Sequence, residues 1–377
     1  MFKLLCVSFF LSTVAFSKTD SAAIKIGVAG PFTGAYAMFG KQLWEGTTLA
    51  AKSINAEGGI NGRKIELVKG DDACEPKQAV AVANKFVEQD KVDAVVGHFC
   101  SSSTIPAARI YNDARTVMIT PASTNPKVTG MNYPMVFRTC GRDDQQGIVA
   151  AAFIANRLQA KRVAIIHDKD TYGQGLADET RKNLKKAKIT EVLYEGLTRG
   201  EKDFSALVTK IKAKRADAVF FGGIHAEAGL LVKQMRQQGL KAHFISGDGI
   251  VSEDFVVVAG GTKFVDGVYM TYSREPRDEP TAAKVVATFR KNGFEPEGYT
   301  LYAYAAMQAL VAAMQKNKAA TGKRHDSMAV AKWLKSNPVA TVLGKKEWDK
   351  NGDLTAAGYV IYKWNDKGKY KVLETGI

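Results

Sequence analysis

Residues 92–124 read VDAVVGHFCSSSTIPAARIYNDARTVMITPAST, and this stretch decides the fold. A valine-rich apolar run is followed by a helix-forming segment, PAARIYNDA, and then by a second apolar run, TVMITP. Strand, helix and strand in this order are typical of a parallel β-α-β unit. Two segments rich in hydroxyl side chains, CSSST and PAST, follow the two apolar runs directly.

The same alternation continues on both sides of this unit. Upstream, the pattern predicts strands at 24–29 and 64–69 and helices at 42–55 and 76–89. Downstream it restarts at RVAIIHD (162–168) and continues to HFISGD (243–248). Two series of similar size predict an α/β protein with two similar lobes, each built on a parallel sheet with helices on both faces. A length of 377 residues agrees with two domains.

The C-terminal third differs from the rest. The segment from Tyr299 to Lys316 is rich in Ala and Met on one face, which predicts a helix packed in the core. The tail, 345–374, alternates with period two and is interrupted by Asn-Gly and Asp-Lys-Gly, which predicts strands in a hairpin or meander.

The N-terminus, 1–17, has the pattern of a secretory signal peptide. Lys3 supplies the positive charge, Leu4 to Ala15 is a short apolar stretch, and Ala15-Phe16-Ser17 places small residues at a cleavage site. The apolar stretch is too short to span a bilayer. The alternative is a buried first helix, whereas a lipid anchor at Cys6 fits poorly because most of the apolar run comes after it. We therefore expect export to the periplasm.

Export makes a disulfide chemically permissible. Cys74 and Cys100 lie within one early segment and form the natural pair, with two buried free thiols as the alternative. Cys140 stands alone, and there is no CxxC pair, so neither a redox motif nor a cysteine zinc site is supported.

The net charge is +15. A basic protein can bind nucleic acid or an acidic membrane surface. Here the lysines are dispersed at helical spacing, as in RKNLKKAKI and KIKAKRADA, and few aromatic residues lie among them. The pattern favours solvated helix faces, and we expect no nucleic-acid partner.

The hydroxyl-rich segments are the first candidate site. Ser101 to Thr104 and Ala122, Ser123 and Thr124 follow the carboxyl ends of two predicted strands, where open α/β sheets bind ligands. A helix N-terminus beside hydroxyl groups suits a carboxylate, although the same residue types also serve as ordinary helix N-caps. Asp248, in SGDGI, follows a strand of the second series and could pair with an ammonium group, with an Asp-Gly turn as the alternative. Tyr172 lies at a further strand end, where it could cover a ligand.

Enzyme and metal motifs are not supported. The segment GAYAMFGKQ has five residues between Gly34 and Gly40, and Gln42 replaces the Ser or Thr of a P-loop. In DKNGDL, Leu354 takes the glycine position of a calcium loop, so a hairpin turn is favoured. No GxSxG or HxxxH occurs, and the five histidines are interpreted as structural. We therefore expect no cofactor, no metal and no catalysis.

Several segments, taken together and in order, resemble one family. DDACEPKQAVAVANKFV, GHFCSSST, MITPAST, HDKDTYGQGLA and GEKDFSALV are similar to the leucine/isoleucine/valine-binding proteins of bacterial ABC importers. The resemblance implies a type I periplasmic binding protein, that is, two Rossmann-like lobes with parallel central sheets joined by a three-strand hinge. It implies an N-terminal lobe at 24–142 plus 273–352, and a C-terminal lobe at 143–272 plus 353–377.

The resemblance also implies a binding scheme and the Cys74–Cys100 disulfide. Ser101 would bind the ligand carboxylate, and Asp248 would bind the ligand ammonium group. Ala122 and Thr124 would bind both groups, and Ser123 lies between these two residues. Tyr172 would close over the ligand. Four positions depart from the family pattern. Phe39 replaces a tyrosine or tryptophan, and Ile224 replaces a tyrosine. Tyr299 stands where the family often has phenylalanine, and Asp248 where it usually has glutamate.

These features predict a monomeric periplasmic protein that captures an aliphatic amino acid (leucine, isoleucine or valine) between its lobes and presents it to an inner-membrane ABC permease. Two alternatives stay open. One is a preference for other small amino acids, such as alanine, threonine, phenylalanine or γ-aminobutyrate. The other is a sensory binding protein of the same fold.

Overall fold

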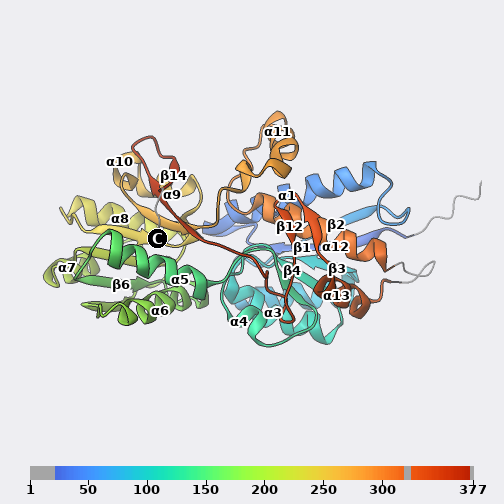
Figure 1. The fold of residues 1–377 in the computed structure, drawn as a ribbon, viewed down its shortest axis with the longest axis horizontal. Coiled ribbons are helices and arrows are strands. Elements are labelled where there is room, and N and C mark those ends of the chain that lie inside the picture. The colour runs from blue at the N-terminus through green and yellow to red at the C-terminus, as the bar shows by residue number, and fades with distance from the viewer. Residues whose placement is uncertain (1–21, 318–323, 374–377) are drawn as a thin grey trace, which may run out of the picture.

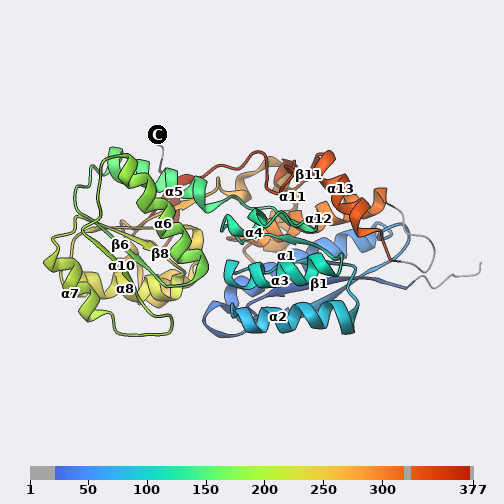
Figure 2. The same cartoon turned by 90° about the horizontal axis from the view of Figure 1, so that it is seen from below.

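A computed structural model of the chain describes residues 22–317 and 324–373. The expected signal peptide at 1–17, with Cys6, lies outside the described residues. Two α/β lobes lie side by side along the long axis of the molecule (Figures 1 and 2). Each is built on its own central sheet, which confirms the predicted fold class.

The first lobe contains a five-stranded parallel sheet in the order β2-β1-β3-β4-β5. Strands β1, β3 and β4 are almost wholly buried because helices cover both faces of the sheet, and this explains their apolar sequences. The strands are β1 Ile24–Gly30, β2 Ile65–Asp71, β3 Ala94–Val96, β4 Val117–Thr120 and β5 Val136–Arg138.

Helices from two distant parts of the chain cover this sheet. The predicted core helix from the C-terminal third, α12, packs along α1 from the N-terminal part, and Gly46 of α1 allows the close approach because a Cβ there would meet the Thr300 carbonyl oxygen. The helices are α1 Ala37–Ala56, α2 Pro76–Asn84, α3 Ser101–Asp113, α4 Lys127–Gly130, α11 Ala283–Lys291, α12 Thr300–Lys316 and α13 Ser327–Ser336. A short hairpin, β11 Val339–Thr341 and β12 Gly344–Lys346, completes this part.

The second lobe contains a seven-stranded sheet in the order β14-β13-β10-β9-β8-β6-β7. Five of its strands are parallel, and the last two form an antiparallel hairpin on β10. The strands are β6 Val163–His167, β7 Leu193–Gly196, β8 Ala218–Gly222, β9 His243–Ser246, β10 Tyr269–Tyr272, β13 Val360–Trp364 and β14 Tyr370–Val372. The helices are α5 Asp143–Ala152, α6 Thr171–Lys186, α7 Ser205–Ala213, α8 His225–Gln237, α9 Asp254–Ala259 and α10 Thr262–Val265.

The chain passes between the two sheets three times, after β5, after β10 and before β13 (Figure 1). The last passage divides the C-terminal tail. The Asp-Lys-Gly turn joins β13 to β14 in the second lobe, as predicted, whereas β12 pairs with β11 beside the first sheet.

Helix α3 begins earlier than the sequence pattern predicts. The proline suggested a start near Pro106, but the helix begins at Ser101, and Pro106 lies in its second turn. Pro106 has no backbone N–H to donate to the Ser102 carbonyl oxygen, yet the helix continues to Asp113. The hydroxyl-rich segment is therefore the first turn of the helix.

The predicted disulfide between Cys74 and Cys100 is present, with a Cα–Cα distance of 5.4 Å. It ties the loop after β2 to the residue that precedes α3. Cys140 is a buried free thiol. Within residues 22–317 and 324–373, no helix has both the length and the apolar character needed to cross a membrane.

Candidate functional site

The carboxyl ends of strands from both sheets meet where the lobes face each other. Residues after β3 and β4 come from the first lobe, and residues after β6, β8 and β9 come from the second. This follows from the parallel topology, because all parallel strands of a sheet end at the same edge.

A cavity lies between these strand ends. Six of the nine predicted ligand-binding residues line it: Ser101, Ala122, Tyr172, Ile224, Asp248 and Tyr299. Phe99, Cys100 and Gly249 complete the lining. Residues far apart in the sequence thus form a single cavity between the lobes.

The first-lobe side of the cavity presents the N-terminus of α3. The N–H groups of Ser103 and Thr104 donate to the Cys100 carbonyl oxygen at 3.0 and 2.9 Å. The N–H groups of Ser101 and Ser102 have no acceptor within the described chain. The Ser101 hydroxyl accepts a bond from the Asn125 N–H at 3.3 Å, which leaves its own proton available to a ligand. Unpaired N–H groups at the positive end of a helix dipole, beside a hydroxyl donor, suit a carboxylate.

The other three predicted residues lie behind the cavity wall. The Ser123 hydroxyl is 2.5 Å from the Thr104 hydroxyl and 2.8 Å from the Phe99 carbonyl oxygen, so its side chain holds the two hydroxyl-rich segments together. Thr124 is buried, and its carbonyl oxygen accepts from the Asp143 N–H at 3.0 Å. Phe39 stacks on Phe99, with ring centroids 4.3 Å apart, and supports the wall that Phe99 forms.

The second-lobe side of the cavity presents the Asp248 carboxylate. It accepts hydrogen bonds from the Tyr172 hydroxyl at 2.6 Å and from the Tyr299 hydroxyl, which belongs to the first lobe. No lysine or arginine within the described chain forms an ion pair with it. Burial raises the pKa of Asp248, and the hydrogen bonds it accepts act in the opposite direction. A buried carboxylate without a cationic partner in the chain suits a cation from outside the chain.

Sequence reasoning missed two residues of this site, Gln146 and Asp143. The Gln146 amide nitrogen donates to Asp248 at 3.1 Å and to Asp143 at 3.2 Å, while its oxygen accepts from the Asp248 N–H and the Thr271 hydroxyl. Burial, together with the charge of Asp248, raises the pKa of Asp143 well above its usual value. Neither residue belongs to a recognisable motif, because the first turn of α5 approaches the site only in the folded protein.

The remaining wall is apolar. Ile224 is 2% exposed and lies opposite Phe99 and Ala122 of the first lobe in the lining. Behind it, burial lowers the pKa of His225 to about 4, so this ring is neutral near pH 7. The apolar part of the lining therefore suits an aliphatic side chain.

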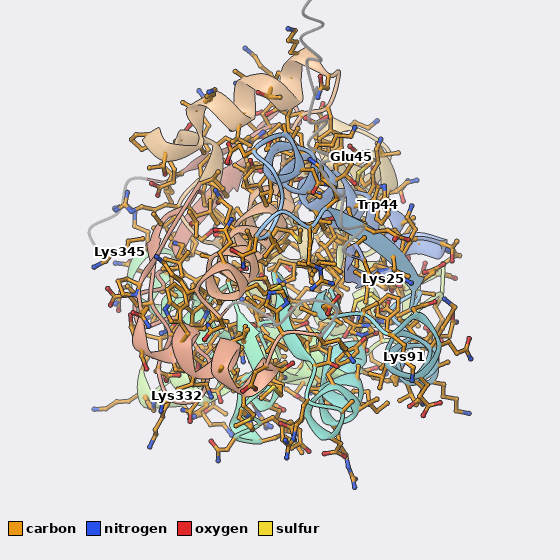
Figure 3. All side chains as sticks on the ribbon, turned by 90° about the vertical axis from the view of Figure 1, so that its right-hand side faces the viewer. Lys25, Trp44, Glu45, Lys91, Lys332 and Lys345 are labelled. Carbon is orange, nitrogen blue, oxygen red and sulfur yellow. A yellow bond between two sulfur atoms is a disulfide. The ribbon has the colours of Figure 1, made fainter. Side chains whose placement is uncertain are left out.

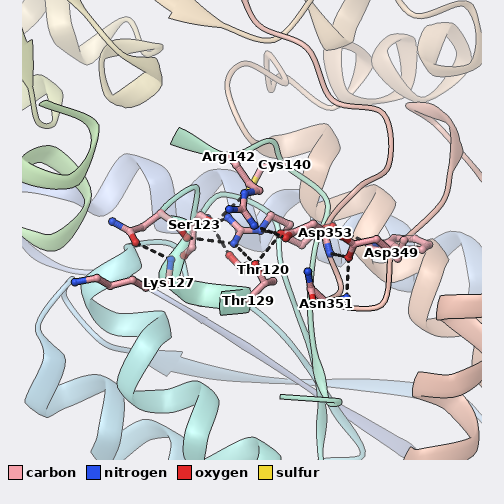
Figure 4. A network of polar contacts seen from close by, with 12 residues as sticks. Thr120, Ser123, Lys127, Thr129, Cys140, Arg142, Asp349, Asn351 and Asp353 are labelled. Atoms are coloured by element: carbon pink, nitrogen blue, oxygen red, sulfur yellow. Dashed lines mark hydrogen bonds and ion pairs between the residues drawn. The ribbon is translucent and has the colours of Figure 1, made fainter. Parts of the chain in front are cut away.

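A polar network beneath the cavity holds the loop 122–125 in place (Figure 4). Arg138 is completely buried, pairs with Asp353 at 2.7 Å, and donates to the carbonyl oxygens of Ser123 and Asn125. Arg142 pairs with the other oxygen of Asp353 at 2.6 Å. Asp353 is thus fully engaged by arginines, and Asp349 accepts from the N–H groups of Asn351 and Asp353, as expected for a turn.

The lobes are in contact in this structure. Besides the Tyr299–Asp248 bond, the Tyr36 hydroxyl donates to Glu227 at 3.2 Å, and the Asn125 amide donates to the Thr171 carbonyl oxygen at 2.8 Å. Each of these bonds joins a first-lobe residue to a second-lobe residue. The structure is therefore a closed form in which the cavity lies between the lobes.

The histidines, cysteines and acidic residues within 22–317 and 324–373 do not gather into a metal site. No cluster of three or more His, Cys, Asp or Glu residues there could hold a metal ion. His98, the histidine nearest to Ser101 in sequence, is 2.5 Å from Asp72 and 3.0 Å from the Tyr111 hydroxyl, so both of its ring nitrogens are engaged.

Known proteins share this architecture over most of the chain. Residues 23–369 match the periplasmic binding protein family. An amino acid binding protein of Pseudomonas aeruginosa is 60% identical over 362 residues, which cover 96% of each chain. A Leu/Ile/Val-binding protein homolog of Brucella abortus is 47% identical over 366 residues, again covering 96% of each chain.

The crystal structure of a leucine binding protein from Thermotoga maritima has a TM-score of 0.85 at 27% identity and covers 93% of this chain and 98% of that one. A branched-chain amino acid transporter substrate binding protein from Streptococcus pneumoniae, in complex with isoleucine, has a TM-score of 0.81 at 28% identity, covering 93% and 99%.

Proposed function

The chain belongs to the periplasmic binding protein family, and from that membership we propose that it is the substrate-binding component of an ABC importer for leucine, isoleucine or valine. The observation that carries the proposal is the pairing of two complementary groups in one cavity. The α3 N-terminus at Ser101 suits a carboxylate, and Asp248, which has no cationic partner, suits an ammonium group. An α-amino acid supplies both charges at a short, fixed separation.

The apolar wall supports the aliphatic part of the proposal. This wall offers the ligand side chain no charged partner, because it consists of Ile224, Phe99 and Ala122. A relative from Brucella abortus is named for leucine, isoleucine and valine, and a solved relative from Streptococcus pneumoniae holds isoleucine. The Pseudomonas aeruginosa relative is named only for amino acids, so the assay should include smaller and aromatic ligands.

The proposed mechanism is hinge closure. The lobes are proposed to comprise 24–142 plus 273–352, and 143–272 plus 353–377. The first lobe captures the ligand carboxylate at Ser101, and the second then rotates to bring Tyr172 and Asp248 onto the ammonium group. A ligand stabilises the closed form by its higher affinity for that form. The closed protein is presented to a permease in the inner membrane, and no catalytic step is involved. We place the mature protein in the periplasm, exported by the segment 1–17.

The test is binding by protein that has been unfolded and refolded to remove any ligand carried through purification. Leucine, isoleucine, valine, alanine, phenylalanine and γ-aminobutyrate are compared by thermal shift and calorimetry. A ligand at a hundred times its dissociation constant stabilises the folded state by about 2.7 kcal/mol. We expect the branched-chain amino acids to give the largest shifts. If no amino acid of the panel raises the melting temperature or produces a binding isotherm, the proposed function is wrong.

The ammonium site has its own test. Asp248→Asn keeps the shape of the side chain but removes its charge and replaces one acceptor oxygen with an NH2 donor. We expect leucine affinity to fall by about 1.5–3 kcal/mol, as for other hydrogen bonds to charged groups. Asp266→Asn, at an exposed aspartate of the same lobe, is the matched control. Equal affinity of the two variants would exclude Asp248 as the ammonium partner.

A further inference from the structure

The second lobe carries an unbalanced positive charge at the edge of its sheet that lies opposite the candidate site. Four segments lead into the amino ends of β6, β7, β8 and β9: residues 157–162, 185–191, 212–217 and 236–243. We call them together the basic edge. Because these strands are parallel, the four segments lie at one edge of the sheet, and the ligand-facing loops lie at the other.

Hydrogen bonds between the segments confirm that they are neighbours. The Arg162 guanidinium donates to the carbonyl oxygens of Lys214 at 2.7 Å and Arg215 at 3.2 Å. The Lys212 ammonium donates to the Gln238 carbonyl oxygen at 2.8 Å. Three of the four segments are therefore joined side by side, and the fourth enters β7, which pairs directly with β6.

The basic edge contains eleven lysines and arginines but only two acidic residues. The cations are Arg157, Lys161, Arg162, Lys185, Lys186, Lys188, Lys212, Lys214, Arg215, Arg236 and Lys241. All of them except Arg236 are exposed. The edge therefore holds a large share of the protein's net charge of +15.

None of these eleven cations forms an ion pair within the described chain. The two acidic residues are engaged elsewhere: Glu191 pairs with Arg181, and Asp217 accepts the backbone N–H groups of Lys161 and Arg162 at 2.8 and 3.0 Å. The positive charge of the basic edge is thus not neutralised by the protein itself.

Helix dipoles account for only part of this charge. Five of the cations lie in the last turn of a helical segment, where they interact favourably with its negative end: Arg157, Lys185, Lys186, Lys212 and Arg236. The other six lie beyond the last turn, in the connecting loops: Lys161, Arg162, Lys188, Lys214, Arg215 and Lys241. Helix stabilisation does not require these six residues.

At the opposite end, the labelled cations Lys25, Lys91, Lys332 and Lys345 are spread widely around the first lobe (Figure 3). The segment that leads into the next strand of this sheet, β10, has no such excess of positive charge, because Asp266 balances Lys263 there. The charge is therefore a local feature and does not simply reflect a basic composition.

We propose that the basic edge is a docking surface for an anionic phospholipid membrane. Seven of its eleven cations are lysines and ten of the eleven are exposed, a pattern that suits a diffuse layer of negative headgroups. The four segments contain no Phe, Tyr or Trp, so the stacking platforms typical of single-stranded nucleic-acid binding are lacking. α7, which precedes one of the segments, lies at the end of the molecule remote from the first lobe, so docking there leaves the cavity accessible (Figures 1 and 2).

The experiment compares sedimentation of the purified protein with two kinds of vesicle. One contains phosphatidylcholine alone, and the other contains one third phosphatidylglycerol. We expect the protein to sediment only with the anionic vesicles, and the bound fraction to decrease as salt is raised, because the Debye length is only about 8 Å at physiological ionic strength.

Two charge-reversal variants locate the surface. The first triple variant reverses three charges of the basic edge: Lys161→Glu, Lys214→Glu and Lys241→Glu. The second makes the same change in net charge at exposed sites elsewhere: Lys52→Glu, Lys284→Glu and Lys332→Glu. We expect the first triple variant to lose most of its vesicle binding, the second to keep it, and both to bind amino acids like the unaltered protein.

Three outcomes would overturn the proposal: no sedimentation with anionic vesicles at physiological salt, equal losses in the two triple variants, or binding of a DNA oligonucleotide through the basic edge in place of vesicles. Each of these can occur with amino-acid binding intact, so failure of the docking proposal is distinguishable from failure of the proposed function.

Discussion

Ser101 and Ser103 lie in the same turn of α3, but only Ser101 lines the cavity. Ser101→Ala removes the hydroxyl that we assign to the ligand carboxylate, and we expect it to weaken leucine binding by about 1–3 kcal/mol. Ser103→Ala removes a buried hydroxyl from the same helix without touching the cavity, so calorimetry should show unchanged affinity. Equal effects of the two substitutions would mean that the helix start, and not the Ser101 hydroxyl, is what matters.

Glu297 gives the interlobe contact a dependence on pH. Its carboxylate accepts bonds from the Ser252 hydroxyl and the Glu253 N–H, both at 3.3 Å, and it is 9% exposed. Burial, followed by the nearby charge of Glu253, raises the pKa of Glu297 from 4.5 to about 7. A raised pKa means that the folded protein holds this proton more tightly than the unfolded chain does. The associated stability is therefore fully present below pH 4.5 and is lost as pH rises through about 7.

We therefore expect Glu297→Gln to gain stability relative to the unaltered protein as pH increases. The amide keeps an acceptor oxygen but cannot ionise. The difference in unfolding free energy should be small near pH 4.5 and should approach about 3 kcal/mol above pH 7, since one pKa unit corresponds to about 1.4 kcal/mol. Urea unfolding across this pH range measures the difference. A constant difference between the two proteins would show that Glu297 does not titrate in this way.

At the residue scale, the sequence predicted the cavity lining well where a residue follows a parallel strand. Ser101, Ala122, Ile224 and Asp248 all stand just after such strands, so topology alone brings them together. Gln146 could not be predicted in this way. Its two contacts with Asp248 span 102 positions and depend on how α5 packs against β10, which no local pattern reports.

At the scale of elements, the start of α3 depends on the disulfide that precedes it. Cys100 is the residue before α3, and its bond to Cys74 closes a loop with a sequence separation of 26. The chain-entropy relation gives roughly 3–4 kcal/mol of stabilisation for a loop of this size. The disulfide therefore anchors the turn that we assign to the ligand carboxylate.

We expect Cys74→Ser with Cys100→Ser to lower the free energy of unfolding by roughly 3–4 kcal/mol and to weaken leucine binding as well. Denaturant unfolding with and without reductant measures the first effect. Cys140→Ser, at the buried free thiol, is the control, because it keeps the Cys74–Cys100 disulfide and its stability should respond to reductant as that of the unaltered protein does. If the unaltered protein were equally stable in both conditions, the disulfide would not contribute to stability.

Elements were easier to predict than their junctions. Alternating strands and helices gave the two parallel sheets, because each apolar run is buried between helices. The alternating pattern alone did not assign β12 and β13 to different lobes, and only the family resemblance, with its lobe boundary between 352 and 353, implied that division. Which lobe each strand joins depends on the third passage of the chain, and that is a property of the whole fold.

At the scale of the whole molecule, closure rests on bonds outside the cavity as well as on the ligand. The Tyr36 hydroxyl, in the first lobe, donates to Glu227 in the second, and Glu227 is 3% exposed. Tyr36→Phe leaves that buried carboxylate with one donor fewer in the closed form only. If the open form is fully solvated there, closure becomes less favourable by about 1–3 kcal/mol. The apparent affinity for leucine falls with the fraction of protein that can close.

The radius of gyration, measured by small-angle X-ray scattering, tests this prediction directly. We expect leucine to compact the unaltered protein and to compact Tyr36→Phe only at a higher concentration, although Tyr36 does not line the cavity. Tyr194→Phe is the matched control, because the Tyr194 hydroxyl donates to Asp178 at 2.7 Å within the second lobe alone. Its titration should coincide with that of the unaltered protein. If Tyr36→Phe also gave an unchanged titration, the Tyr36–Glu227 bond would not contribute to closure. The ligand contacts would then have to supply the free-energy difference between the open and closed forms.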